Sequence, residues 1–187
     1  MKNKLLIIAA LFVGIAAYAQ PRAVGIRIGA GISASYQHTV GNDNMVSLDV
    51  DFPMFNGGIS AAATYDWVFG INSWNNKGSW NWYAGVGAGI GMRWPNVNRQ
   101  NYGNITSKVS AGYMNIGVAG RIGVEYNFWF PLQLSLDWRP VIGPEIDWYN
   151  AVTTTDGHTV RDNNTGVGFS TKGIYAGAIS LGIRYKF

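Results

Sequence analysis

The sequence of 187 residues contains no cysteine, little charge and no long apolar run after its first residues. The absence of cysteine excludes disulfide bonds, thiolate metal sites and the acylated N-terminal cysteine of a lipoprotein. Charged residues make up 13% of the chain, whereas about 25% is usual for a soluble globular protein. After Gln20, no apolar stretch reaches the ~20 residues that a membrane-spanning helix needs. A protein built on spanning helices is therefore excluded for residues 21–187.

Basic and acidic residues nearly balance. The formal net charge is +4, and without Lys2 and Lys4 the chain keeps 12 basic and 10 acidic residues, a net of +2. So small and scattered an excess argues against nucleic acid as a partner. The length suits one domain.

The N-terminus has the pattern of a secretory signal peptide. A start with two lysines is followed by the apolar run Leu5–Ala16 and by the tripeptide AYA at 17–19, which fits the small-x-small cleavage rule. The apolar run is too short for a transmembrane anchor. We expect residues 1–19 to be removed and residues 20–187 to form one exported domain.

Most of this domain alternates with a period of two, which is typical of β-strands. From Met114 to Phe128 one face is apolar and the other carries Asn, Arg, Glu, Gly and Ala. Residues 175–187 repeat the pattern and end on the apolar face at Phe187. In the segment WNWYAGVGAGIGMRW, Trp80–Trp94, the large apolar residues occupy one face and glycine most of the other.

This distribution favours a transmembrane β-barrel over a soluble sandwich. A sandwich buries its apolar faces between two sheets and carries ordinary charged residues outside, whereas here the charges lie on the polar face of strands that are aromatic near their ends. Aromatic strand ends with aliphatic residues between them are typical of barrels in lipid. Because lipid leaves no backbone edge unpaired, the sheet is expected to close. The apolar faces then contact lipid and the glycine faces the interior.

The fold class that we predict is all-β, a closed antiparallel up-and-down barrel of eight strands. Reading residues 22–37 as one strand would place the two long polar connectors, 95–112 and 142–171, on opposite sides of the membrane, so we divide it at Gly29-Ala30-Gly31. Both connectors are then external loops, and Asp156-Gly157 suits a hairpin tip in the second. The predicted strands are 22–29, 31–39, 45–52, 59–68, 80–94, 113–127, 132–141 and 172–187.

The interior faces collect both signs of charge. Because an eight-stranded barrel is just wide enough for side chains to fill it, we expect these groups to form an ion-pair network and not to line a wide pore. A selective channel would show one dominant sign. The expected basic members are Arg27, Arg93, Arg121, Arg139, Arg184 and Lys186, and the acidic members are Asp49, Asp51, Asp66, Glu125 and Asp137.

The signal peptide, the segments SWNWYAGVGAGIGM and IGVEYNFWFPLQLSLDWRP, and the terminal LGIRYKF resemble the small outer-membrane β-barrel proteins of gram-negative bacteria, of the OmpX and OmpA-barrel type. The resemblance covers nearly all of the domain. It implies location in the bacterial outer membrane, and recognition of Ile183, Tyr185 and Phe187 by the barrel-assembly machinery. Partners on the surface or in the envelope are left open.

No catalytic, cofactor or metal site is expected. His38 and His158 have no Ser or acidic partner at a spacing that suits catalysis. If the protein were an enzyme acting on lipid or peptide, Ser33, His38 or His158 would have to be its catalytic residues. Asp147, Asp156, His158 and Asp162 could converge on a cation, but no calcium-loop spacing is present. A structural or surface-interaction role is the leading hypothesis. A narrow channel, an enzyme and a subunit of a larger envelope complex are the alternatives.

Overall fold

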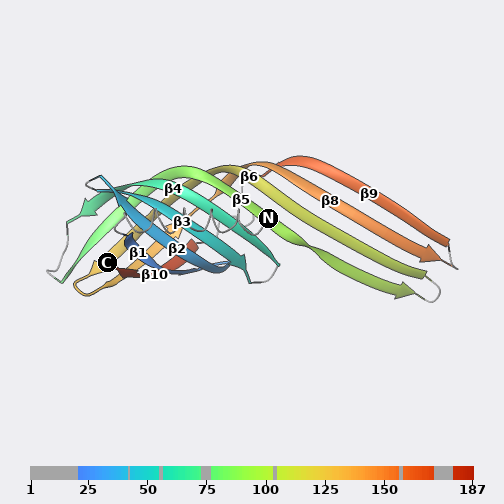
Figure 1. Ribbon diagram of the computed structural model, residues 1–187, viewed down its shortest axis with the longest axis horizontal. Helices are drawn as coiled ribbons and strands as arrows, with labels where there is room; N and C mark the ends of the chain where they lie inside the picture. The colour runs from blue at the N-terminus through green and yellow to red at the C-terminus, as the bar shows by residue number, and fades with distance from the viewer. Residues whose placement is uncertain are drawn as a thin grey trace, which may run out of the picture.

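The computed structural model describes residues 21–41, 43–54, 57–72, 77–102, 105–155, 158–170 and 179–187. These residues form an antiparallel β structure in which both ends of the sheet meet, and the predicted signal peptide lies outside them. Figure 1 shows a barrel from one end of which long strands project. The strands are β1 Pro21–Ile28, β2 Gly31–Val40, β3 Asn44–Pro53, β4 Gly58–Ile71, β5 Gly78–Tyr102, β6 Ile105–Phe128, β7 Leu132–Trp138, β8 Val141–Thr155, β9 His158–Ser170 and β10 Ile179–Lys186.

The barrel is closed by eight strands, as predicted. Neighbours pair from β1 to β6 in chain order, β6 also pairs with β7, β7 with β10, and β10 with β1. Ile26 is in register with Ala34 of β2 and with Ile183 of β10, so the division between 22–29 and 31–39 is correct. The turn at Gly29 and Ala30 lets the chain reverse there.

The prediction that 95–112 and 142–171 are loops is wrong. Residues 94–102 and 105–112 lengthen the β5–β6 hairpin, while β8 pairs with β6 and β9 pairs with β8. Thr155 is in register with His158, so β8 and β9 form a hairpin, and its predicted tip, 156–157, lies outside the described residues. Residues 94–102, 105–115, 143–155 and 158–170 thus form a four-stranded sheet beyond the barrel, which we call the extension (Figure 1).

Strands β7 and β8 pair with β6 one after the other along its length. Ile122 is in register with Trp138 and Val118 with Ile142, and between them the Gly120 amide donates to the Pro140 carbonyl at 3.0 Å. The predicted seventh strand, 132–141, therefore ends at Trp138 and the ladder resumes at Val141. The predicted last strand, 172–187, is seen as β10; residues 171–178 lie outside the described ones.

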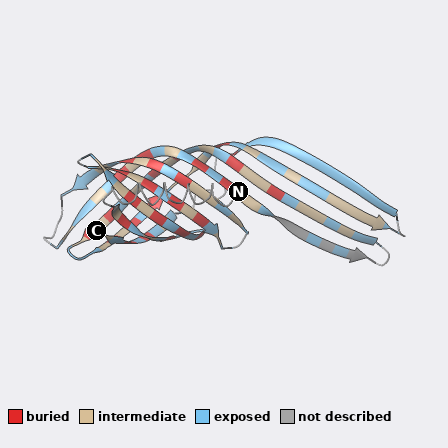
Figure 2. Cartoon of the chain, in the orientation of Figure 1, coloured by how far each residue is buried: buried red, intermediate tan, exposed pale blue. Residues whose placement is uncertain are grey.

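Polarity in the barrel is inverted relative to a soluble protein. Among the described residues, the buried apolar side chains are Ala23, Met45, Ala62, Tyr83 and Ala119, and the buried polar ones are far more numerous. Large apolar side chains lie on the outer surface instead: Ile90 is 50% and Val118 63% exposed. In Figure 2 buried and more exposed residues alternate along the barrel strands, whereas the extension is mostly exposed. Interior and exterior follow the period of two in the sequence.

Aromatic side chains gather on the outer surface at the end of the barrel opposite the extension. Phe69 stacks on Trp82 with ring centroids 4.3 Å apart, and Trp80 lies 4.8 Å from Tyr126. At the C-terminus Tyr185 and Phe187 are exposed and contact each other edge to face at 5.1 Å. Ile183 is exposed on the same outer face. This end of the barrel thus carries an aromatic band.

Candidate functional site

Asp137, from β7, lies at the centre of the barrel interior. Its carboxylate is paired with Arg27 of β1, and the Arg121 guanidinium of β6 donates to its Oδ2 at 3.2 Å. The Tyr83 hydroxyl donates to the same oxygen at 3.1 Å, and the Arg121 guanidinium lies 5.1 Å from the Tyr83 ring centre. Side chains from four strands, β1, β5, β6 and β7, thus meet at one carboxylate. Each side chain is there because its position faces inward.

Two further carboxylates complete the centre of the network. Arg27 donates to Asp49 Oδ2 at 3.1 Å, and Arg121 lies 3.4 Å from Asp66 Oδ2 and 3.7 Å from Asp49 Oδ2. The Ser47 hydroxyl donates to Asp66 at 2.7 Å. Each central arginine therefore bridges carboxylates from different strands, which compensates the cost of burying it.

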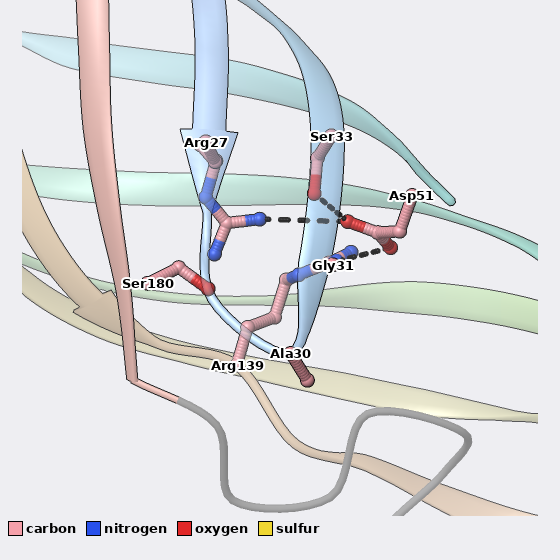
Figure 3. A pocket seen from close by; sticks show the side chains of 7 residues that line it. All are labelled: Arg27, Ala30, Gly31, Ser33, Asp51, Arg139 and Ser180. Carbon is pink, nitrogen blue, oxygen red and sulfur yellow. Dashed lines mark hydrogen bonds and ion pairs between the residues drawn. The ribbon is translucent and has the colours of Figure 1, made fainter. Parts of the chain in front are cut away.

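Asp51 organises the end of the interior from which the extension rises. Arg139 donates to its Oδ2 at 2.6 Å, the Ser33 hydroxyl donates to its Oδ1 at 2.6 Å and the Ser60 hydroxyl donates to its Oδ2 at 2.8 Å. Figure 3 shows Arg27 and Arg139 converging on Asp51 from opposite sides of a small pocket. The pocket has room for about 10 Å³, which is about the space that one water molecule needs.

Glu125 organises the end of the interior near the termini. It is paired with Arg22, and the amides of Asn81 and Gln133 donate to it at 2.9 and 3.0 Å. At the mouth of the barrel beside this layer lies a pocket of about 540 Å³, and Arg22, Asp43 and Asn81 are among its lining residues. The two pockets therefore differ: the pocket at the extension end is small, and the terminal end opens into a wider polar mouth.

Three of the basic residues in the expected network make no ion pair within the described part of the chain. Arg184 is buried and donates to Ser35 at 2.9 Å and to Ser135 at 2.6 Å. Arg93 lies over the Tyr113 ring, 5.6 Å from its centre, beyond the ion-pair layers. Lys186 donates to the Phe128 carbonyl at 3.1 Å. The remaining expected members lie in the ion-pair layers.

Glycines of β5 leave the space that these side chains occupy. A Cβ on Gly85 would lie 2.0 Å from Asp66 Oδ1 and 2.5 Å from the Tyr65 carbonyl oxygen. A Cβ on Gly89 would lie 2.8 Å from a methyl group of Val141. The glycine face of the segment at 80–94 thus faces the interior, where larger residues would collide with the network.

Among the described residues, the catalytic and cation-binding groups considered from the sequence do not come together, and Asp156 lies outside those residues. Ser33 points inward and donates to Asp51, whereas His38 follows the outward-facing positions of β2 and His158 starts β9 at the far end of the extension. Asp147 is in register with Gly166, and Asp162 lies four residues along β9 from there. Among the described residues no group of three or more His, Cys, Asp or Glu side chains could hold a metal ion.

The sequence reasoning missed several partners in the network. Arg22 lies at the very start of β1 and was not assigned to the interior, although it pairs with Glu125. Tyr83 lies on the inward face of β5 together with the glycines, and it was not assigned to the interior because aromatic residues were expected on the outer face. Its position two residues before Gly85 was the available signal. The buried hydroxyl and amide groups of Ser35, Ser47 and Gln133 could have been read from the same alternation.

Comparisons of the chain with protein-family models, with curated proteins and with solved structures give no match. Within the ranges that the structure describes, no helix is long and apolar enough to cross a membrane. The function of the chain is therefore inferred from the geometry of the barrel and its extension.

Proposed function

We propose that this chain is an integral outer-membrane β-barrel protein that performs no catalysis and presents its extension outside the cell. The inverted polarity carries the proposal: a closed barrel with an ionic interior and an apolar exterior suits lipid and not water. The aromatic band supports it, because Trp and Tyr favour the interface between lipid and water. The signal-peptide pattern and the resemblance to small outer-membrane barrels support export to that membrane.

In this orientation the start of β1, the end of β10 and the aromatic band face the periplasm, and the extension faces outward. The short connections between β2 and β3 and between β6 and β7 lie at the periplasmic end, and the long hairpins β5–β6 and β8–β9 lie at the other. Short periplasmic turns and long external segments are the usual arrangement in bacterial barrels. The barrel then serves as a rigid anchor for a sheet on the cell surface. Ile183, Tyr185 and Phe187 are the proposed signal for the barrel-assembly machinery.

The filled interior favours an anchor over a channel. Asp51, Asp137 and Glu125 each lie in a layer that ties several strands together, and the pocket beside Asp51 has room for about 10 Å³. A conducting pore needs a continuous water-filled path, and a balanced set of interlocked charges opposes one.

Fractionation of gram-negative cells that express the full chain tests the proposal. We expect the protein in the outer-membrane fraction, migrating differently in gels before and after boiling because a closed barrel resists detergent. Protease added to intact cells is expected to cut the extension and leave the barrel. Recovery from the soluble periplasm, or identical mobility before and after boiling, would contradict the proposal. Reproducible unitary currents in planar bilayers would make the protein a channel instead.

A further inference from the structure

The outer face of the extension changes from apolar to basic along its length. The even-numbered residues of β6 face outward, as the exposed Ile116 and Val118 show, and residues in register on neighbouring strands share that face. Moving away from the barrel, the successive rows on β6, β8 and β9 are Met114, Ile146 and Val167; Gly112, Trp148 and Thr165; Ser110, Asn150 and Asn163; and Lys108, Val152 and Arg161.

The rows nearest the barrel carry an apolar surface whose exposure to water would be unfavourable. Val167 is 78% and Phe169 65% exposed, and Ile146 beside Val167 is exposed too. This surface continues the outer face of the barrel through Ile142, which is in register with Val118. It ends at Trp148, whose ring lies over Gly112, where a Cβ would come within 2.2 Å of it. A tryptophan at the end of an apolar surface is typical of the lipid–water interface.

The last of these rows is basic. Lys108 and Arg161 flank Val152, and both are exposed. Two of the three positions on β6, β8 and β9 are thus Lys or Arg, and we call Lys108, Val152 and Arg161 the basic row. It lies four residues beyond the row of Trp148, about 13 Å along the strands. On strands tilted by ~35–45° this corresponds to roughly 10 Å along the membrane normal.

The acidic residues of the extension lie on the opposite face. Glu145 is in register with Asn115, and Asp147 with Tyr113, two residues whose odd numbers place them on the inner face of β6. Asp162 is in register with Ala151 on that face too. Apart from Arg93, which is in register with Tyr113 where the extension meets the barrel, the two faces of the sheet therefore differ in sign of charge. A solvated sheet has no need of this segregation.

We infer that the outer face of the extension docks on the external surface of the membrane, with the basic row bound to anionic, phosphate-bearing lipid headgroups. The apolar rows meet acyl chains, the row of Trp148 lies at the interface, and the lysine and arginine side chains meet the headgroups. The inference rests on the proposed function, because it requires the barrel to lie in a membrane. It adds a lipid partner and leaves the acidic inner face for the aqueous side.

The absence of cysteine permits a direct test. Single variants Thr165→Cys and Asn164→Cys place a fluorophore on opposite faces of β9 at neighbouring positions. The labelled full-length protein is inserted into vesicles of phosphatidylcholine, with or without phosphatidylglycerol, that contain lipids with a nitroxide on the headgroup. With phosphatidylglycerol, we expect the label at 165 to be quenched several-fold more than the label at 164.

Removing the basic side chains should release the extension. In the Thr165→Cys background, the double change Lys108→Gln and Arg161→Gln is expected to weaken docking by about fivefold per charge, because each cation near an anionic surface contributes about that factor. Added salt should have the same effect. The matched control, Asp147→Asn with Asp162→Asn, alters two charges on the inner face and should keep the quenching. Quenching that is equal at 164 and 165, or unaffected by the loss of both cations, would overturn the inference.

A second label separates this inference from the proposed function. Val118→Cys lies on the outer face of the barrel, 63% exposed in the parent, and is tested with nitroxides on the acyl chains. If the label at 118 is quenched while the labels at 164 and 165 behave alike, the barrel is inserted and only the docking is wrong. If the label at 118 is not quenched, the proposed function fails as well. Gel mobility before and after boiling verifies that each variant is folded.

Discussion

Replacing Asp137 by asparagine tests whether the ionic interior holds the barrel together. The carboxylate is paired with Arg27 and with Arg121 and accepts from Tyr83, and the amide of asparagine has the same size but no charge. Removing one partner of a buried ion pair costs about 3–5 kcal/mol, because the remaining charge stays buried without compensation. Arg27 keeps Asp49 at 3.1 Å and Arg121 keeps Asp66 at 3.4 Å. We therefore expect a loss near the lower limit, about 3 kcal/mol.

Urea unfolding of the refolded protein in vesicles measures this loss. At a slope of ~2 kcal/mol per molar urea, a destabilisation of about 3 kcal/mol lowers the midpoint by roughly 1.5 M. Asp162→Asn, on the exposed β9, is the control and should change stability by less than about 0.5 kcal/mol. If Asp137→Asn matches this control, the interior is hydrated enough to tolerate an uncompensated arginine. That result would mean that interlocked side chains do not fill the interior of the barrel.

Three other predictions address facing, space and assembly. Ile122→Arg puts a charge on the outer face near the middle of the barrel and should destabilise the inserted protein by ~2–4 kcal/mol in urea unfolding, whereas Asn163→Arg on the extension should be tolerated. Gly85→Ala brings a methyl group against Asp66 and should cost ~1–3 kcal/mol, whereas Gly166→Ala meets nothing within 4 Å and should be neutral; equal unfolding midpoints would contradict the inward position of Gly85. Phe187→Ala should lower the amount of heat-modifiable protein in the outer-membrane fraction without lowering total synthesis, and unchanged yield would remove Phe187 from the proposed assembly signal.

Alternation predicted the barrel because one face of each strand is apolar. The division at Gly29-Ala30-Gly31 followed from parity alone, and the register of Ile26 with Ala34 agrees with it. Asp49, Asp66 and Arg121 could be placed inside by counting along their strands. The pairing within the network could not be predicted, since it depends on the stagger between strands that are far apart in sequence.

The outer part of the extension escaped prediction because, beyond the row of Trp148, neither face of the sheet is consistently apolar. The β9 sequence carries polar residues on both faces, with glycine at 166 and 168, and therefore resembles a loop. One edge of its backbone is nevertheless paired along β8, from Thr155 and His158 to Gly143 and Ser170. Hydrogen bonding along a neighbouring strand thus decides the conformation here, and hydrophobic patterning does not report it.

The pairing of β1 with β10 restricts how such a chain can be made. The first strand of the barrel finds its second neighbour only in the final residues, where Val24 meets Tyr185. Until these residues have left the ribosome, β1 and β7 each keep an unpaired edge, and closing so large a loop is slow. The nascent chain therefore has to be kept from aggregating through these edges until β10 is available to close the barrel.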